Sequence, residues 1–337
     1  MPAARPRRRP TIVDVADAAG VAPSTVSRAF SRPGRVNRHT REHIVAVAER
    51  LGYAPNPAAQ ALESGRTRTI ALLVPDITNP YFSGVIKGAE RAAAAAGLTL
   101  VLGDTQENPA REEELVRRLG RSVDGFVLSA SRLPDEDLHR AAELNPITLV
   151  NRAAPGVSCV VADYDTGTEQ IVDHLASYGH ESFAFAGGPA ESWSGARRWS
   201  GLRKAAKVRR MRAHRSGPYT PTLLGGPAAA DAVLASGATA VVCHNDMLAI
   251  GLMRRLAERG VRVPEDLSVV GFDDIFGADF CSPALTTLAE RTDDAGARAV
   301  EALVRQIPQR ATDPPTRVLP THLVVRASTG PAPSTRR

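Results

Sequence analysis

The sequence predicts an α/β protein that combines a small all-α head with a two-lobed body of doubly wound parallel sheets. From residue 69 onward, short apolar segments alternate with segments of helical period, which is typical of parallel strands joined by right-handed crossovers. Two such sets follow one another, so the body should contain two lobes. A chain of 337 residues is also too long for one ordinary core.

The strands of the body are expected to be continuously buried because their sequences are almost wholly apolar. The first set is TIALLVPD, LTLVLGD, VDGFVLSA and PITLVN, and the second is SFAFAGG, AVVCHN and LSVVGFDD. Between them lie amphipathic segments such as FSGVIKGAERAAAAAG and DMLAIGLMRRLAERG. The 204–225 segment fits neither pattern and leaves one side of the second lobe without an assignment.

Composition excludes several classes of protein. Hydrophobic residues make up 43% and charged residues 23%, as in soluble globular proteins. No apolar run approaches the length of a membrane span, and no apolar segment follows the basic start MPAARPRRRP, so we expect neither a membrane partner nor a secretory signal. The expected location is therefore the cytoplasm.

Nothing in the sequence predicts catalysis, a metal or a cofactor. The three cysteines are far apart and are expected to be buried free thiols: Cys159, Cys243 and Cys281. His174, His180 and His244 lack metal-ligand spacing, and neither a phosphate-binding glycine motif nor a GxSxG elbow occurs. We therefore expect a binding protein rather than an enzyme.

Positive charge is concentrated in the head. Residues 1–68 hold twelve arginines and no lysine against five acidic residues, a net charge of +7. The other 269 residues hold thirty basic and thirty-one acidic residues, a net charge of −1. A basic head on a neutral body indicates a module that binds a polyanion, although the run from Arg5 to Arg9 is equally consistent with a solvated arm.

Two short helices stand close together in VADAAGVAPSTVSRAF, residues 15–30. Gly20 should end the first, because glycine enters the left-handed C′ conformation without steric cost. Pro23 should open the second, where a missing N–H costs nothing, although Ala22 before it has no side chain to cap the helix. The second helix has Val26 and Phe30 on its inner face and small polar residues elsewhere.

A third helix follows in RVNRHTREHIVAVAERLGY. Asn37 should cap it and Gly52 should end it, and its inner face should comprise Ile44, Val45, Ala48 and Leu51. Three helices in about fifty residues with a sharp turn between the first two are the helix-turn-helix plan.

A fourth, very short helix is predicted after the third. Asn56 can cap it and Pro57 can open it, but it can extend only to about Glu63 before Ser64 and Gly65. Seven residues are too few for an isolated helix in water. The segment is thus either a fraying linker or a helix that forms only on DNA, against its copy in a dimer.

Four segments of the chain resemble the lac-repressor (LacI/GalR) family of bacterial transcription regulators: DVADAAGVAPSTVSRAF, TREHI, YAPNPAAQAL and IALLVPDITNPYF. The similarity extends from about Thr11 to Arg326. It implies a nucleoid-associated repressor whose second helix lies in the DNA major groove and whose hinge helix lies in the minor groove. It also implies a body like that of periplasmic sugar-binding proteins, with three crossings between lobes near residues 164, 290 and 320.

The resemblance assigns DNA contacts residue by residue. Arg28 would read a guanine through a bidentate contact, and Leu62 would wedge into the central base step of the operator. Ser24 and Thr25 would face bases or phosphates, and several other positions would contact the DNA backbone. The expected DNA-binding residues are Ser24, Thr25, Ser27, Arg28, Asn37, Thr40, Tyr53, Asn56, Gln60 and Leu62.

Ligands of open parallel sheets bind beyond the carboxyl ends of the strands, and polar residues follow several predicted strands. These residues include Asp76, Asn79, Asn151, Arg152, Asn245, Asp246, Asp273 and Asp274. We interpret Asp246 as a helix N-cap, and Trp193 and Phe82 as rings able to stack on a sugar. The family resemblance adds Arg198 and supports Asn245 and Asp273. The expected effector-binding residues are Asp76, Asn79, Phe82, Asn151, Trp193, Arg198, Asn245 and Asp273.

The predicted protein is thus a repressor that binds pseudo-palindromic double-stranded operator DNA as a homodimer under the control of a small effector. A sugar is the expected effector, a purine or nucleoside the alternative, and a sugar-binding protein without a DNA role the third hypothesis. The tail lacks the leucine heptads of a coiled coil, which argues against a tetramer. The expected division is a basic arm (1–10), a helix-turn-helix domain (11–56), a hinge and linker (57–68), an effector and dimerisation domain (69–328) and a flexible tail (329–337).

Overall fold

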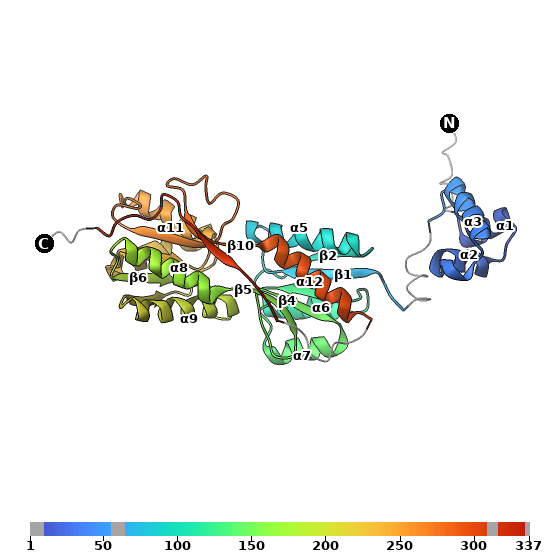
Figure 1. Ribbon diagram of the computed structural model, residues 1–337, viewed down its shortest axis with the longest axis horizontal. Coiled ribbons are helices and arrows are strands. Elements are labelled where there is room, and N and C mark those ends of the chain that lie inside the picture. The colour runs from blue at the N-terminus through green and yellow to red at the C-terminus, as the bar shows by residue number, and fades with distance from the viewer. Residues whose placement is uncertain (1–9, 55–64, 309–315, 334–337) are drawn as a thin grey trace, which may run out of the picture. The chain divides into compact units, whose positions relative to one another are not determined.

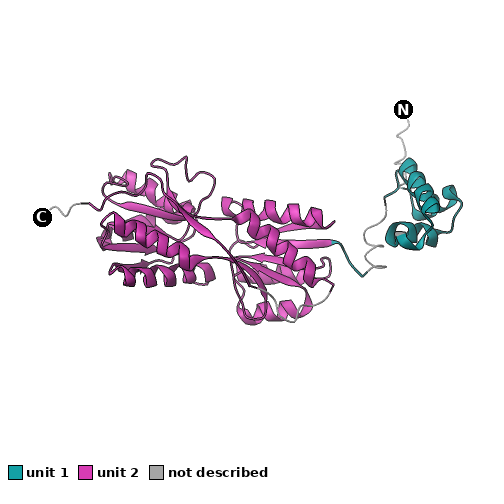
Figure 2. Cartoon of the chain, in the orientation of Figure 1, with its two compact units in different colours: residues 1–68 teal, residues 69–337 magenta. Residues whose placement is uncertain are grey.

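The computed structural model describes residues 10–54, 65–308 and 316–333. The chain forms two compact units, residues 1–68 and residues 69–337, which are coloured separately in Figure 2. Of the residues predicted to contact DNA, Asn56, Gln60 and Leu62 lie outside the described residues, as does the hinge helix. The two units are described separately below.

The first unit contains three α-helices in its described part. These are α1 (Ile12–Ala19), α2 (Pro23–Ser31) and α3 (Arg38–Leu51), with a 3₁₀ turn (Pro33–Arg35) between the last two. Gly20 and Gly52 end α1 and α3 in the left-handed conformation, with φ of 66° and 68°. The side chain of Asn37 caps α3 by accepting a hydrogen bond from the His39 amide at 3.0 Å. These starts and stops follow the sequence signals.

The core of the first unit is small and differs from the predicted one in α3. Its fully buried members are Val15, Ala16, Val26, Ala29, Ile44, Val47 and Ala48. Leu51 was expected to be buried but is 38% exposed, and Val45 is only half-buried. Ile44, Val47 and Ala48 share one face at the i, i+3, i+4 spacing, whereas Leu51 lies in the last turn of the helix.

The second unit has two six-stranded sheets, one in each lobe (Figure 1). The N-lobe sheet has the order β11-β5-β4-β3-β1-β2 and is parallel throughout. Its strands are β1 (Thr69–Val74), β2 (Thr99–Asp104), β3 (Phe126–Ser129), β4 (Ile147–Val150), β5 (Ser158–Ala162) and β11 (Thr316–Leu319).

Helices cover both faces of the N-lobe sheet. The first pair is α5 (Pro80–Ala95) and α12 (Thr292–Gln306), and the second is α6 (Pro109–Leu119) and α7 (Asp135–Leu144). Alternate residues of β1 point to the two sides, since Leu72 packs with the first pair and Leu73 with the second. This is the doubly wound arrangement that the sequence predicts.

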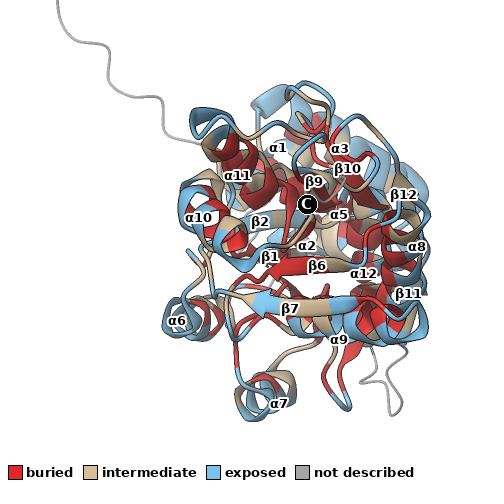
Figure 3. Cartoon of the chain, turned by 90° about the vertical axis from the view of Figure 1, so that its left-hand side faces the viewer, coloured by how far each residue is buried: buried red, intermediate tan, exposed pale blue. Residues whose placement is uncertain are grey.

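The C-lobe sheet has the order β12-β10-β9-β8-β6-β7 and is parallel except for the antiparallel pair β10 and β12. Its strands are β6 (Ser182–Ala186), β7 (Arg212–Ser216), β8 (Ala240–Cys243), β9 (Ser268–Asp273), β10 (Thr286–Glu290) and β12 (Thr321–Val324). Its helices are α8 (Tyr164–Ser177), α9 (Trp193–Val208), α10 (Gly226–Ser236) and α11 (Asp246–Glu258). Figure 3, which colours the chain by burial, shows that β6 is buried.

The chain passes between the lobes three times. It leaves the N-lobe between β5 and α8, returns between β10 and α12, and leaves again between β11 and β12. These passages lie at residues 163, 291 and 320, close to the expected positions. A site between the lobes can therefore draw on both sheets and on the three crossings.

Two expectations about burial are wrong. Strand β2 was expected to be continuously buried, but it is an edge strand, and its Val101 and Leu102 are 36% and 43% exposed. An apolar strand sequence therefore does not distinguish an edge strand from a central one.

The second wrong expectation concerns the cysteines. Cys281 is partly exposed, whereas Cys159 and Cys243 are buried as expected.

The tail is packed further than expected. Thr329 and Gly330, placed in a flexible tail by the sequence, are buried on the C-lobe. His174 hydrogen-bonds the hydroxyl of Thr329 at 2.8 Å, and the amide of Ala332 donates to the carbonyl of Tyr178. The expected free tail therefore does not begin at residue 329.

None of the described helices is both long enough and apolar enough to cross a membrane.

Candidate DNA-binding helix and effector cleft

Helix α2 presents a polar surface to solvent. Val26 and Ala29 are buried in the core of the first unit, while Ser24 and Arg28 are exposed and Thr25 and Ser27 half-buried. The N-cap position holds Ala22 and makes no side-chain hydrogen bond, and Pro23 is the first helical residue. The helix is thus held by one narrow apolar side and leaves its polar residues available to a partner.

The other described residues predicted to contact DNA also have structural roles. Asn37 caps α3 and is exposed, and Thr40 is half-buried in the first turn of α3. Tyr53 packs its ring against Phe30, with ring centroids 6.0 Å apart, and burial raises the pKa of its phenol. The expected contacts of Asn37, Thr40 and Tyr53 with the DNA backbone remain predictions.

A cleft between the two lobes of the second unit collects most of the residues predicted to bind the effector. Its free volume is about 30 Å³, room for a water molecule rather than for a sugar. The lining residues come from both lobes: Asn79, Tyr81, Phe82, Glu107, Ala130, Arg132, Asn151, Ser194, Arg198, Pro221, His244, Asn245 and Asp273. Six of the eight predicted effector residues are among them.

Arg198 is the centre of this cleft. It projects from α9, is 2% exposed, and pairs with Asp273 at 2.9 Å and Glu290 at 3.1 Å. It also donates to the hydroxyl of Tyr164 at 3.2 Å and to the carbonyl of His244. Nη2 makes both ion pairs and Nη1 donates to the His244 carbonyl, so contacts at both terminal nitrogens hold the guanidinium in one orientation.

Aromatic rings complete the surroundings of Arg198. Its guanidinium carbon lies 4.4 Å from the ring centroid of Phe272 and 5.0 Å from that of Tyr164. Such cation–π contacts are strongest where water is excluded. The charge of Arg198 is therefore stabilised within the protein by both paired carboxylates and ring faces.

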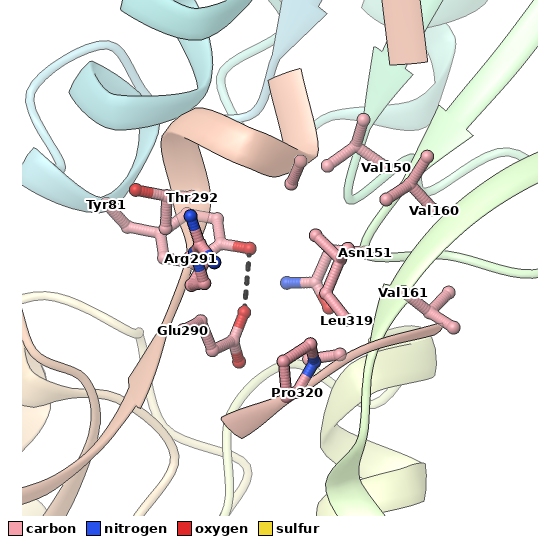
Figure 4. Close-up of a pocket in the computed structure, with 12 residues that line it drawn as sticks. Tyr81, Val150, Asn151, Val160, Val161, Glu290, Arg291, Thr292, Leu319 and Pro320 are labelled. Carbon is pink, nitrogen blue, oxygen red and sulfur yellow. Dashed lines mark hydrogen bonds between the residues drawn. The ribbon is translucent and has the colours of Figure 1, made fainter. Parts of the chain in front are cut away.

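The same network reaches the N-lobe. The hydroxyl of Tyr81, on α5, donates to Glu290 at 3.0 Å, and the hydroxyl of Tyr164 donates to the side chain of Asn151. Figure 4 shows Tyr81, Asn151 and Glu290 pointing toward one another beside the crossings at Arg291 and Pro320. Polar contacts therefore join the two lobes directly at the point where they hinge.

Burial governs the protonation of these groups. Desolvation raises the pKa of Tyr81 and Tyr164 well above the ordinary value, so both hydroxyls keep their protons and donate. Burial also raises the pKa of Asp273, against the opposing effect of Arg198. Burial opposes the charge on Arg198, but the nearby Tyr164, Asp273 and Glu290 hold its pKa well above the usual range.

Two buried nitrogen atoms at the cleft have no hydrogen-bond partner in the structure, Nε of Arg198 and Nδ1 of His244. Burial, together with Arg198, Arg132 and Arg215, lowers the pKa of His244 well below its ordinary value, so the imidazole is neutral. A neutral imidazole offers one donor and one acceptor. Unsatisfied buried polar atoms are costly, and a bound ligand with hydroxyl groups could satisfy them.

Backbone strain marks the strand ends that line the cleft. Ala130, Asn151 and Asp273 have φ of 47°, 55° and 108°, in a region that non-glycine residues seldom adopt. Each ends or follows a parallel strand, namely β3, β4 and β9. Strained residues of this kind concentrate at binding sites, where the surrounding structure holds them in place.

Two predicted effector residues lie away from the cleft. Asp76 accepts hydrogen bonds from the amide and hydroxyl of Thr78, which stabilise the turn after β1. Trp193 begins α9 and packs against the apolar cores of both lobes rather than facing the cavity. The strand-end position of Asp76 did not reveal its local partner, and the aromatic character of Trp193 did not distinguish a ring that stacks on a ligand from one that packs on the core.

The N-cap of α11 is Asn245 and not Asp246 as predicted. The side chain of Asn245 accepts from the Leu248 amide at 3.0 Å and donates to the Pro221 carbonyl at 2.9 Å. Asp246 is fully buried, accepts from Thr287 at 2.6 Å, and has its pKa raised by burial to about 7. It is a structural link between β8 and β10 rather than a cap.

Two other polar strand-end residues are also engaged elsewhere. Arg152 pairs with Asp135 and donates to the Leu133 carbonyl, and Asp274 pairs with Arg326 at 2.7 Å. Neither belongs to the cavity lining. The polar residues that follow the strands therefore do not all converge on the cleft, in contrast to the prediction.

Sequence reasoning missed several cavity residues: Tyr81, Glu107, Arg132, Ser194, Pro221, His244 and the hinge residue Glu290. Tyr81 and His244 adjoin predicted residues, so the same strand-end argument could have included them. Glu107 and Arg132 form an ion pair at 2.7 Å across 25 positions of sequence. No local pattern marks such a pair, because only the fold brings the two loops together.

Two parallel-sheet lobes joined by three crossings around a polar cleft, with a separate helix-turn-helix unit, define a ligand-responsive DNA-binding regulator. The family model for bacterial regulatory proteins of the lacI family matches residues 11–56, and that for the periplasmic binding protein-like domain matches residues 172–329. The transcriptional repressor CytR of Escherichia coli strain K12 is 32% identical over 333 residues, which cover 96% of this chain and 97% of that protein. The chain therefore belongs to the lacI family of bacterial regulatory proteins.

Solved structures agree with this assignment. The Lac repressor dimer bound to operator and the anti-inducer ONPF superposes with a TM-score of 0.84 at 27% identity, covering 96% of this chain and all of that one. The complex of the transcriptional regulator CelR with cellobiose gives a TM-score of 0.70 at 31% identity over 95% of this chain and all of that one. These proteins are transcriptional regulators, and the chain is a regulator of transcription rather than an enzyme.

Proposed function

We propose that this chain is a dimeric repressor that binds operator DNA through α2 and is controlled by a neutral sugar bound between its lobes. The observation that carries the effector proposal is the buried Arg198–Asp273 pair at the meeting point of two lobes. An arginine and a carboxylate side by side donate to and accept from neighbouring hydroxyl groups. The similarity to a regulator crystallised with cellobiose supports the same class of ligand.

The charge balance of the cleft favours a neutral ligand. Arg132 and Arg198 line it together with Glu107 and Asp273, and both arginines have a carboxylate partner at hydrogen-bonding distance. A phosphate group would have to compete with these carboxylates for the arginines. Neutral sugars are therefore expected to bind, and sugar phosphates are not.

The small size of the cleft implies movement. A free volume of about 30 Å³ cannot hold a sugar ring, whereas sites for small ligands have roughly 300–1,000 Å³. Effector entry must therefore separate side chains such as Tyr81 and Arg198 or rotate the lobes about the three crossings. This requirement couples effector binding to lobe geometry, the kind of change that alters operator affinity in a two-state regulator.

A thermal-unfolding screen tests the effector proposal. Neutral mono- and disaccharides should raise the melting temperature of the full chain in a saturable manner, and sugar phosphates should not. Nucleosides form the comparison group for the alternative effector class. The stabilisation should vanish in Asp273→Ala and persist in Asp274→Ala, because Asp274 pairs with Arg326 outside the cleft. A screen in which only nucleosides stabilise the protein would replace the sugar by that alternative.

The DNA-binding proposal depends on the exposed face of α2. Arg28→Ala should weaken operator binding by about 1–3 kcal/mol and binding to random DNA far less, because a bidentate base contact is sequence-specific. Arg32→Ala, at the C-terminal end of the same helix, is the matched control. Gel shifts with the DNA upstream of the gene measure both. Equal losses on operator and random DNA would make Arg28 a phosphate contact.

Exposed apolar residues support the proposed homodimer. Val101 and Leu102 lie on the open edge of the N-lobe sheet, and Phe276 and Phe280 of the C-lobe are 80% and 69% exposed. The rings of Phe276 and Phe280 contact each other, with centroids 5.0 Å apart, and we take these exposed pairs as parts of a surface that a second copy of the chain covers. Analytical ultracentrifugation should show a dimer that dissociates on Phe276→Asp with Leu102→Asp and persists on Val208→Asp. A wild-type monomer at micromolar concentration would contradict the proposal.

A further inference from the structure

A second cavity lies on the N-lobe, away from the cleft between the lobes. It is a groove between α6 and α7 with a volume of about 780 Å³, against about 30 Å³ for the effector cleft. These two helices cover the sheet face opposite to α5 and α12. A volume of this size is within the range of sites that bind small organic ligands.

Apolar residues from α6, α7 and the loop before α7 line part of the groove. Val116 and Leu133 are buried members of the core under α6 and α7, and Ala141 is partly buried against the same core. Leu144, at the last turn of α7, is 76% exposed at the rim. An apolar ligand chain in the groove would cover Leu144 and extend the existing core, at about 25 cal/mol for each Å² removed from water.

Charged side chains also line the groove: Glu113, Arg117 and Arg121 in and just beyond α6, and Asp137 and Arg140 on α7. Arg117 and Arg121 line the groove at the C-terminal end of α6, both are exposed, and the described part of the chain offers neither of them an ion pair. Arg118, between them, points elsewhere and pairs with Glu114 at 3.5 Å. Arg140 also lines the groove but is already paired with Asp137. The lining therefore holds three arginines against two carboxylates, and Arg117 and Arg121 make no ion pair within the described residues.

We propose that this groove binds an amphipathic carboxylate, a small molecule with one acidic group and an unbranched apolar chain. The carboxylate would accept hydrogen bonds from Arg117 and Arg121, and the chain would lie on Val116, Leu133 and Leu144. A guanidinium is the side chain best suited to bidentate binding of a carboxylate. The site differs in charge from the effector cleft, whose arginines are neutralised, so it would recognise a different class of ligand.

Isothermal titration of the full chain with decanoate, kept below its micellar concentration, tests the proposal. Decanoate should bind saturably with one site per chain, and octanoate should bind roughly tenfold more weakly because two methylene groups are missing. Decanol, which has the same chain without the charge, should bind at least tenfold more weakly than decanoate. Acetate, which has the charge without the chain, should not bind measurably.

Three variants locate the site. Arg117→Ala combined with Arg121→Ala should weaken decanoate binding at least tenfold, and Leu144→Asp should do the same. Arg118→Ala is the matched control, since it lies on the same helix outside the groove and should leave binding unchanged. Circular dichroism and thermal unfolding verify that each surface variant is folded.

Three results would overturn the proposal. If decanoate does not bind the wild-type chain, the groove does not bind amphipathic carboxylates. If decanol binds as tightly as decanoate, the two arginines do not contribute to binding. Equal losses in Arg118→Ala and in the double variant would show that decanoate associates with helix α6 through general charge rather than through the groove.

Discussion

The two units of this regulator differ in where they place their arginines, which are exposed to solvent in the first unit and buried beside carboxylates at the cleft of the second. In the first unit, arginines such as Arg28 on α2 and Arg35 in the turn after it are exposed to solvent around a core of seven buried apolar residues. In the second, Arg198 is 2% exposed and shares two buried carboxylates. Exposed cations attract a polyanion and are screened by salt, whereas buried pairs orient a neutral ligand and are screened little. The two proposed recognition sites of the chain should therefore differ in their sensitivity to salt.

The largest expected effect follows from the head. If each of two heads neutralises about five phosphates, log K against log[salt] should slope near −9, so operator affinity should fall by roughly 10⁵ between 50 and 200 mM salt. Effector stabilisation of the body should change little over the same range. Gel shifts and thermal unfolding at matched salt concentrations measure the two. A slope shallower than about −3 would contradict a two-headed clamp.

Removing Arg198 should give the next largest effect. Arg198→Ala leaves Asp273 and Glu290 buried without their cation, and breaking a buried pair in this way costs about 3–5 kcal/mol. Urea unfolding should show that loss, together with loss of the effector response. Arg197→Ala removes the neighbouring exposed arginine, whose pair with Asp165 is 3.4 Å long, and should cost less than about 1 kcal/mol.

Similar losses of unfolding free energy in Arg198→Ala and Arg197→Ala would contradict this difference between a buried and an exposed arginine. Equal and small losses would mean that the carboxylates around Arg198 take up protons or water without cost. The pairing would then stabilise the body no more than a surface pair does.

Buried histidines of the body should make its stability sensitive to acid. His180 lies between Thr239, Ser268 and Gly330, and burial lowers its pKa. The unfolded chain then binds more protons below the ordinary histidine pKa of about 6.5, so stability is lost as the pH falls through that value. Asp246 acts in the opposite direction, because burial raises its pKa to about 7.

A difference between variants separates these two contributions. His180→Asn should destabilise the protein at pH 7.5 and should do so less at pH 5.5, where the wild-type histidine has lost part of its stabilising effect. Asp246 is present in both proteins and cancels. Urea unfolding at the two pH values provides the measurement, and a destabilisation that does not change with pH would remove His180 as the acid-sensitive group.

Local signals predicted the parts of the fold that local chemistry determines. Gly20, Asn37 and Gly52 set helix ends through their own backbone and side-chain chemistry, and the structure has those ends. The apolar runs of β1, β3 and β9 are buried strands for the same reason. These elements need no information from distant parts of the chain.

Elements that depend on distant partners were not predictable. Strand β7 has the polar sequence RAHRS and exists because it pairs with β6 at the sheet edge. The helices α10 and α12 and the strands β5, β10, β11 and β12 were also not identified, although α12 buries Ala295, Ala299 and Leu303 at a helical spacing that the sequence does show. Glu290 belongs to the Arg198 network only because a crossing brings it there from 92 positions away. The sequence alone therefore located strand ends well and side-chain partners poorly.

The smallest expected effect lies within the head, where two neighbouring helices begin differently. Helix α1 has a complete capping box, since Thr11 accepts from the Asp14 amide and the Asp14 carboxylate accepts from the Thr11 amide at 2.7 Å. Helix α2 has Ala22 at the same position and no side-chain cap. The backbone of Ala22 is extended, with φ of −70° and ψ of 147°, so a serine fits there without rearrangement.

Ala22→Ser should stabilise the head by about 1 kcal/mol, because the new hydroxyl can accept from the Ser24 amide, whereas the Thr25 amide already donates to the Ala22 carbonyl at 2.8 Å. Thr11→Ala should cost about as much by removing the cap of α1. Hydrogen exchange of the α2 amides in the full chain measures the gain directly. Unchanged protection in Ala22→Ser would mean that the apolar contacts of Val26 and Ala29 alone set the stability of α2. The operator affinity of Ala22→Ser should be measured as well. If operator affinity falls while protection of the α2 amides rises, the free amides at the N-terminus of α2 bind a DNA phosphate, as helix N-termini do in other proteins.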